Sequence, residues 1–87
     1  MAKRNKLEII RDILTIVRDN RSVKPTPLLR KSNLSSSRFK GYYSDLLEKG
    51  FVRETLGGNK QISLTKKGQK YLEKYSIIIS FIDEFEL

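Results

Sequence analysis

The stretch LLEKGFVRETLGGNKQISLTKKG, residues 46–68, decides the fold of this 87-residue chain. Its first part ends at Gly50, and glycine commonly stops a helix because it adopts left-handed backbone angles without a steric penalty. Two β-prone runs follow at 51–56 and 60–64, separated by Gly57-Gly58-Asn59. These three residues supply the positive φ angles of a tight hairpin turn. The stretch therefore predicts a β-hairpin that leads into a last helix.

Thr65 is the expected N-cap of that last helix, which we place at residues 66–85. Its apolar residues recur at spacings of three and four on more than one side. A helix that is apolar over so much of its circumference must be covered on more than one face. The domain core can cover one of these faces, so another surface must cover the rest.

Two further helices are predicted directly before the hairpin. One covers residues 36–49 after the N-cap Ser35, and a shorter one covers 27–31 after the N-cap Thr26, with a proline at its first position. Asn33 lies in the turn between them and is a candidate for a left-handed conformation. Two short helices joined in this way form the helix-turn-helix pattern. The inner stripe of the longer helix consists of Phe39, Tyr43, Leu46 and Leu47.

The first helix is predicted at residues 6–19. Its two neighbouring apolar stripes are Leu7, Ile10, Leu14 and Val17, and Ile9, Ile13 and Ile16. Residues 23–25 are expected to be extended, because a residue that precedes proline avoids the helical region. The order is therefore helix, extended piece, helix, turn, helix, hairpin, helix.

The composition is that of one globular domain. With 38% hydrophobic and 32% charged residues, the chain can build a single core but not two. Its longest uninterrupted apolar run is Ile77-Ile78-Ile79, which is far too short to span a membrane. No apolar segment follows Met1-Ala2-Lys3-Arg4, so no signal peptide is recognised and the expected location is the cytoplasm.

Charge is divided unevenly along the chain. Residues 1–75 hold all 18 Lys and Arg and seven of the ten acids, a net charge of +11, whereas residues 76–87 hold three acids and no base. A basic body attracts a polyanion, and an acidic tail does not. Because the chain contains neither histidine nor cysteine, imidazole catalysis, thiol nucleophiles and most transition-metal sites are excluded. We find no catalytic constellation, cofactor motif or ligand pocket, and the expectation is a protein that is not an enzyme.

Three segments carry a resemblance to a known family: Asn33-Leu34-Ser35 at the start of the third helix, Leu46–Val52 leading into the hairpin, and Ile62–Gly68 leaving it. The chain resembles the winged helix-turn-helix DNA-binding domains of archaeal transcriptional regulators and archaeal virus proteins. The likeness covers about residues 6–75 and is strongest to the members with a dimerising C-terminal helix. It implies a mainly α fold with a small β-hairpin wing.

This resemblance divides the chain into a DNA-binding core at residues 1–64, with the wing at about 51–64, and a dimerisation helix at 65–87 of the same compact unit. The recognition helix must present slim, polar side chains to a major groove about 12 Å wide. The expected recognition residues are Ser35, Ser36, Ser37, Arg38, Lys40, Gly41 and Ser44. Gly41 costs about 1 kcal/mol in a helix interior, which suggests close approach to DNA or to a neighbouring helix.

Other residues are expected to contact the DNA backbone, either through charge or through hydroxyl groups. Those around the second helix are Lys24, Thr26, Arg30 and Lys31, and those of the wing are Arg53, Gly57, Gly58, Asn59 and Lys60. A wing arginine can also read the shape of a narrow minor groove. Any one of Lys24, Arg30 and Lys31 by itself is better explained as a solvated surface charge, whereas together they favour a phosphate-facing set. The alternative for the wing is an ordinary hairpin with solvated flanks.

The excess apolar surface of the last helix predicts a homodimer, because large exposed apolar patches are rare on monomers. The expected interface residues are Ile9, Ile13, Ile16, Tyr71, Tyr75, Ile78, Ile79, Ile82 and Phe85. The alternative is a monomer whose first and last helices cover each other. A dimer would present two recognition helices to successive turns of the major groove.

The predicted function is sequence-specific, double-stranded DNA binding by a homodimeric transcriptional regulator. Two alternatives stay open. One is an architectural, chromatin-like protein with little sequence preference, which the strong positive charge favours. The other is a winged-helix module that binds proteins, because a fold does not determine a function.

Overall fold

The computed structural model describes residues 4–55 and 57–87. The elements follow in the order α1 (Lys6–Asp19), β1 (Ser22–Val23), α2 (Pro25–Ser32), α3 (Ser36–Glu48), β2 (Val52–Glu54), β3 (Ile62–Leu64) and α4 (Lys66–Glu84). This is the predicted mainly α fold with a β-hairpin. The predicted first strand extended to Leu56, which lies outside the described residues.

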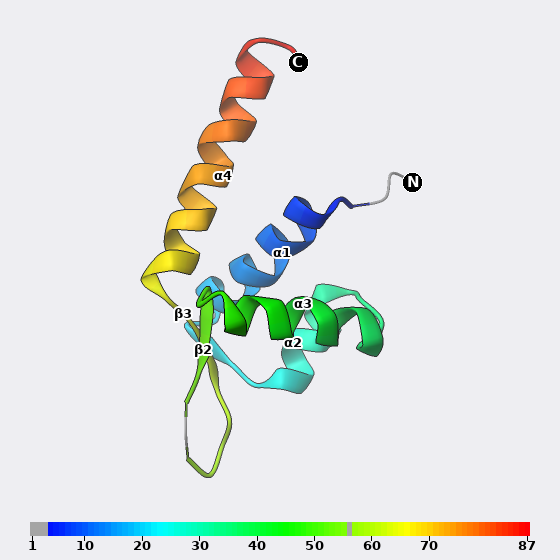
Figure 1. The fold of residues 1–87 in the computed structure, drawn as a ribbon, viewed down its shortest axis with the longest axis vertical. Coiled ribbons are helices and arrows are strands. Elements are labelled where there is room, and N and C mark those ends of the chain that lie inside the picture. The colour runs from blue at the N-terminus through cyan, green and yellow to red at the C-terminus, as the bar shows by residue number, and fades with distance from the viewer. Residues whose placement is uncertain (1–3, 56) are drawn as a thin grey trace.

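The molecule is elongated, and its two ends differ. The loop between β2 and β3 projects at one end of the long axis, and α4 projects at the other (Figure 1). The principal extents are 49, 29 and 21 Å. Helices α1, α2 and α3 lie between these ends, so the hairpin and the distal part of α4 are far apart.

Local capping explains where three of the helices begin. Asn5 accepts a hydrogen bond from the backbone N–H of Glu8 (2.8 Å), and the carboxylate of Glu8 accepts one from the N–H of Asn5 (3.2 Å), which forms a capping box at α1. Ser35 caps α3 as predicted, and Thr65 caps α4 by accepting from the N–H of Gly68 at 3.1 Å. These caps satisfy N–H groups that have no partner inside the helix.

The predicted start of α2 at residue 27 was wrong. The helix begins at Pro25, its N-cap is Lys24 without a side-chain hydrogen bond, and Thr26 lies inside the first turn. The reason is that none of the first four N–H groups of a helix has an intrahelical partner. Both Pro25 and Pro27 therefore fit the first turn without losing a hydrogen bond. Asn33 ends α2 in the predicted left-handed conformation, with φ 58°.

The sheet has three strands rather than the two of the predicted hairpin. Its order is β1-β3-β2 with antiparallel pairing, and Ser22 pairs with Ser63 while Val23 pairs with Ile62. The sequence indicated only an extended segment here. Two residues carry no strand pattern of their own, and their partner strand β3 is distant from them in the sequence.

One apolar core holds these elements together. Its buried members are Ile9, Ile10, Ile13, Leu14, Val17, Val23, Leu28, Phe39, Leu46, Val52, Ile62 and Leu72. Helix α1 lies at its centre and packs on α2, α4 and β3. The prediction that Ile9 and Ile13 belong to a dimer interface was wrong, because only 2% and 1% of these residues are exposed within a single chain. They have no surface left for a second copy.

The junction between the hairpin and α4 is tightly packed. The hydroxyl of Thr65 donates to the carbonyl oxygens of Gly50 (2.6 Å) and Phe51 (3.0 Å). Gly68 is buried at the same place, where a Cβ atom would overlap the carbonyl oxygen of Phe51 and the side chain of Leu64. The Leu-Thr-x-x-Gly pattern therefore fixes the first turn of α4 against the base of the hairpin.

Candidate nucleic-acid interface

Helix α3 has one buried face and one open face. Phe39 and Leu46 point into the core, and Tyr43 stacks on Phe39 with ring centroids 5.6 Å apart. All seven predicted recognition residues, Ser35, Ser36, Ser37, Arg38, Lys40, Gly41 and Ser44, are exposed. The helix thus offers a polar surface of small side chains that no other part of the described chain covers.

Gly41 lies on this open face, and a Cβ atom placed there would meet no atom within 4 Å. Of the two explanations for this glycine, close packing against a neighbouring helix is therefore excluded within residues 4–55 and 57–87. Its φ angle is not positive either, so the backbone does not require glycine. What remains is an open helix surface that a second molecule can approach closely.

The cations around α2 and α3 differ in whether another side chain binds them. Lys31 donates to the side-chain oxygen of Asn20 at 3.1 Å. Within residues 4–55 and 57–87, the structure shows no ion pair for Lys24, Arg30, Arg38 or Lys40, all of which are exposed. These four charges are available to an anionic partner.

The start of α2 and the tip of the hairpin lie side by side. A hollow of about 270 Å³ lies between them, lined by Lys24, Pro25, Thr26, Pro27, Gly58, Asn59 and Lys60. The sequence predicted backbone contacts for Lys24 and Thr26 and for the tip of the hairpin as separate groups. The structure joins them into one continuous surface.

Sequence reasoning missed a contact between α3 and the hairpin. The hydroxyl of Tyr43 donates to Oε1 of Glu54 at 2.6 Å, and Lys60 Nζ lies 3.3 Å from Oε2 of the same carboxylate. The hydrogen bond from Tyr43 and the charge of Lys60 lower the pKa of Glu54, whereas burial and Glu54 raise the pKa of Tyr43. Lys60 is therefore held by a carboxylate, which reduces its availability to DNA.

Arg53 lies on the other face of the hairpin from Glu54. Successive residues of a strand point to opposite sides, and Arg53 pairs with Ser63 while Glu54 pairs with the buried Ile62. Arg53 is exposed and located at the base of the hairpin rather than at its tip. The two predicted wing cations are thus separated by the sheet.

The predicted interface residues of α4 fall into two groups. Tyr71 is half-buried: its hydroxyl donates to the carbonyl of Leu7 at 2.9 Å, and its ring packs edge-on against Phe51. Arg11 lies over the ring of Tyr75 at 5.1 Å, and Ile16 packs on the core. Tyr71, Tyr75 and Ile16 therefore make contacts within the chain, as expected for the alternative in which the first and last helices cover each other.

The distal part of α4 is different, because it extends beyond the core without a neighbour in the described chain (Figure 1). Ile82 is partly exposed. The exposed large apolar residues of this part and of the residues that follow it are Ile77, Ile78, Ile79, Phe81, Phe85 and Leu87. Ile77, Phe81 and Leu87 were not among the predicted interface residues.

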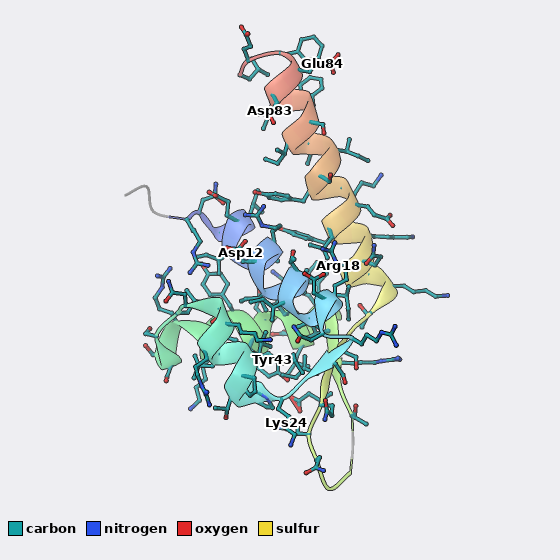
Figure 2. The ribbon with its side chains drawn as sticks, turned by 180° about the vertical axis from the view of Figure 1, so that it is seen from behind. Asp12, Arg18, Lys24, Tyr43, Asp83 and Glu84 are labelled. Carbon is teal, nitrogen blue, oxygen red and sulfur yellow. The ribbon has the colours of Figure 1, made fainter. Side chains whose placement is uncertain are left out.

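Acidic residues of the C-terminal tail and exposed cations around α2 lie apart along the long axis of the molecule. Asp83 and Glu84 lie at the tip of α4, at the opposite end of the molecule from Lys24 (Figure 2). The unpaired cations of α2 and α3 are therefore remote from the acidic tail. Within residues 4–55 and 57–87 there is no cluster of acidic side chains suited to a metal ion. No helix of the described chain combines the length and apolar character needed to cross a membrane.

Comparison with known proteins agrees with this geometry. The family model described as winged helix-turn-helix matches residues 3–83. Among curated protein sequences, none matches the chain significantly. Three solved structures are similar in fold: Sso10a-2, a DNA-binding protein from Sulfolobus solfataricus; F-93 of the archaeal virus SSV1; and the oxidized form of MarR from E. coli.

Sso10a-2 is 18% identical with a TM-score of 0.76, and the match covers 95% of this chain and 86% of that one. F-93 is 24% identical with a TM-score of 0.68, at 88% and 91% coverage. MarR is 22% identical with a TM-score of 0.66, and the match covers 75% of this chain but only 48% of MarR. At these identities the likeness concerns the fold. The open face of α3, the adjoining hairpin and the family match over 3–83 lead to one conclusion: the chain belongs to the winged helix-turn-helix family, and its fold is the DNA-binding winged helix.

Proposed function

We propose that this protein is a transcriptional regulator that binds specific sites in double-stranded DNA as a homodimer. The observation that carries the proposal is the open face of α3, on which small polar side chains and unpaired cations lie together. An α-helix that enters the major groove needs such slim side chains, while cations nearby bind phosphates. Occlusion of a promoter would be the consequence of binding.

The proposed dimer rests on the distal part of α4. The exposed fraction is 62% at Ile77 and 58% at Phe85, and together with their exposed neighbours these residues form a large apolar surface for an isolated chain in water. A second copy supplies a matching surface under two-fold symmetry. The dimer would place two copies of α3 on successive turns of the major groove, about 34 Å apart.

A second candidate is architectural DNA binding with little sequence preference. It is favoured by the recognition face itself, where four of the seven exposed residues are serines. Serine hydroxyls bond to phosphates and to several bases, whereas bidentate contacts from arginine, asparagine or glutamine distinguish them. The two candidates differ in the ratio of specific to non-specific affinity.

The first test is fluorescence anisotropy on a random-sequence duplex of about 30 base pairs across a salt series. We expect the wild-type protein to bind, with log K falling by about 0.9 per phosphate contact for each tenfold increase in salt. Arg38→Ala/Lys40→Ala should weaken binding at least tenfold. Lys66→Ala/Lys70→Ala is the matched control, because it removes two exposed cations from α4.

No binding by the wild type at low salt, or equal loss in both double variants, would contradict the proposal. Where binding is found, selection from a randomised duplex library separates the two candidates. An enriched sequence that binds at least 10³-fold more tightly than random DNA supports the regulator. Enrichment of no sequence supports the architectural protein.

A further inference from the structure

A second hollow lies beside α3, on the side away from the hairpin. It measures about 490 Å³, lies between the start of α1 and the middle of α3, and is lined by Lys6, Ser37, Arg38, Gly41, Tyr42 and Asp45. The hollow is open because two of its wall residues are small: Gly41 has no side chain and Ser37 a short one. A Cβ atom at Gly41 would meet nothing within 4 Å.

The wall of this hollow has a net positive charge. Lys6 and Arg38 are exposed, and no ion pair holds either of them within the described part of the chain. The one carboxylate, Asp45, is paired with Lys49 at 3.1 Å. The other cations of α1 are engaged, since Arg11 binds Asp12 and Arg18 binds Asp19; Arg4, which precedes the helix, also binds Asp12. Lys6 is thus the free cation that α1 contributes next to α3.

The hollow and the hairpin lie on opposite sides of the open face of α3. With 3.6 residues per turn, Arg38 and Lys40 lie about 160° apart around α3. Tyr43 faces the hairpin through its bond to Glu54, and it lies about 60° from Lys40 but about 140° from Arg38. Lys40 and the hairpin therefore flank one side of the open face of α3, and Arg38 and Lys6 flank the other.

A helix that lies in the major groove has a phosphate backbone on each side. The α2 start, the hairpin and Lys40 can serve one strand, which leaves the opposite strand without an assigned contact. We propose that Lys6 and Arg38 bind a backbone phosphate of that opposite strand in the hollow, with the hydroxyl of Ser37 as an additional donor. This inference rests on the proposed DNA binding and adds Lys6, a residue outside the helix-turn-helix and the wing, to the interface.

The chemistry of the hollow fits a phosphate diester. Two cations from different elements can contact its anionic oxygens, and a hydroxyl can donate to one of them. The absence of a side chain at Gly41 leaves space for the sugar–phosphate chain close to α3. The first turn of α1 also carries the positive end of its helix dipole. The nearby carboxylate of Asp45 opposes such binding by charge repulsion. Its removal should therefore strengthen DNA binding, whereas removal of Lys6 should weaken it.

The test compares single variants of the full chain by anisotropy on the same duplex across a salt series. Lys6→Ala should weaken binding about three- to tenfold at low salt and reduce the salt slope by about 0.9, the loss of one phosphate contact. Lys6→Arg should retain the wild-type slope. Lys70→Ala removes an exposed charge from α4 and is the control; it should leave the slope unchanged.

Removal of the carboxylate should act in the other direction. Asp45→Asn should tighten binding about two- to fivefold, whereas Glu73→Gln, which removes an exposed acid from α4, should not. If the wild type binds but Lys6→Ala and Lys70→Ala have equal affinities and slopes, the phosphate site is overturned and the proposed DNA binding stands. If the wild type does not bind duplex DNA, both are overturned.

Discussion

Two helical glycines of this protein lie in opposite environments. Gly68 is buried against the carbonyl oxygen of Phe51 and the side chain of Leu64, while Gly41 faces open space. Gly68→Ala should therefore destabilise the fold by about 1–3 kcal/mol, the usual cost of overpacking. Gly41→Ala should stabilise it by about 1 kcal/mol, because alanine is the better helix former. Urea unfolding of both variants checks this pair.

Both substitutions add one methyl group to a helix, so both gain the same helix propensity. A difference in stability between the two variants therefore reports the steric contacts of the added methyl group. Destabilisation by both variants would mean that Gly41 has a neighbour in the folded chain. Equal stability of Gly68→Ala and the wild type would mean that the junction between the hairpin and α4 is looser than the packing around Gly68 implies.

At the scale of elements, Glu54 connects the hairpin to α3 through Tyr43 and Lys60. Its pKa is lowered below the ordinary value of 4.5, first by the hydrogen bond from Tyr43 and also by Lys60. A carboxyl whose pKa is lowered by folding stabilises the folded state above its unfolded pKa. That contribution is lost as the pH falls below about 4.5 through the lower, folded-state pKa.

We therefore expect Glu54→Gln to have a lower Tm than the wild type at pH 7 and for this difference to shrink as the pH falls below about 4.5. Glutamine still accepts a hydrogen bond from Tyr43 but has no charge for Lys60. The measurement is thermal unfolding by circular dichroism between pH 7 and 3. A gap in Tm that stays constant over this range would show that the charge of Glu54 contributes nothing to stability.

At the scale of the whole molecule, the distal part of α4 is the surface that a single chain leaves uncovered. Phe81 is 53% exposed and its ring contacts Phe85 with centroids 4.8 Å apart. Phe81→Asp places a charge on this apolar face and should convert the proposed dimer into a folded monomer. Loss of bivalent binding should then weaken DNA affinity at least tenfold. Light scattering coupled to size exclusion gives the mass of each form.

Ser80→Asp is the matched control, because it adds the same charge at an exposed polar position one residue away. It should leave both mass and affinity unchanged. A wild-type protein with the mass of one chain would contradict the proposed homodimer without touching the DNA-binding proposal. Circular dichroism should be the same for all three proteins, since neither position belongs to the core.

Much of this structure was predictable because its signals are local. Residues 6–19 form the predicted first helix, the Ser35 and Thr65 caps begin α3 and α4 where expected, and Asn33 is left-handed. Each of these features depends on a few neighbouring residues, whose hydrogen bonds and steric limits are the same wherever the chain goes. The exposure of the predicted recognition residues follows in turn from the helical period of α3.

The sequence by itself thus determined the order of elements, the family and the polar face of α3. Only the tertiary structure decided the rest: the pairing of β1 with β3, the burial of Ile9 and Ile13, and the contact of Tyr43 with Glu54. These features join residues that are distant in the chain. A periodic pattern states that a side chain is apolar or polar, but which neighbour covers it depends on how the helices and strands pack, and that is settled by the whole core at once.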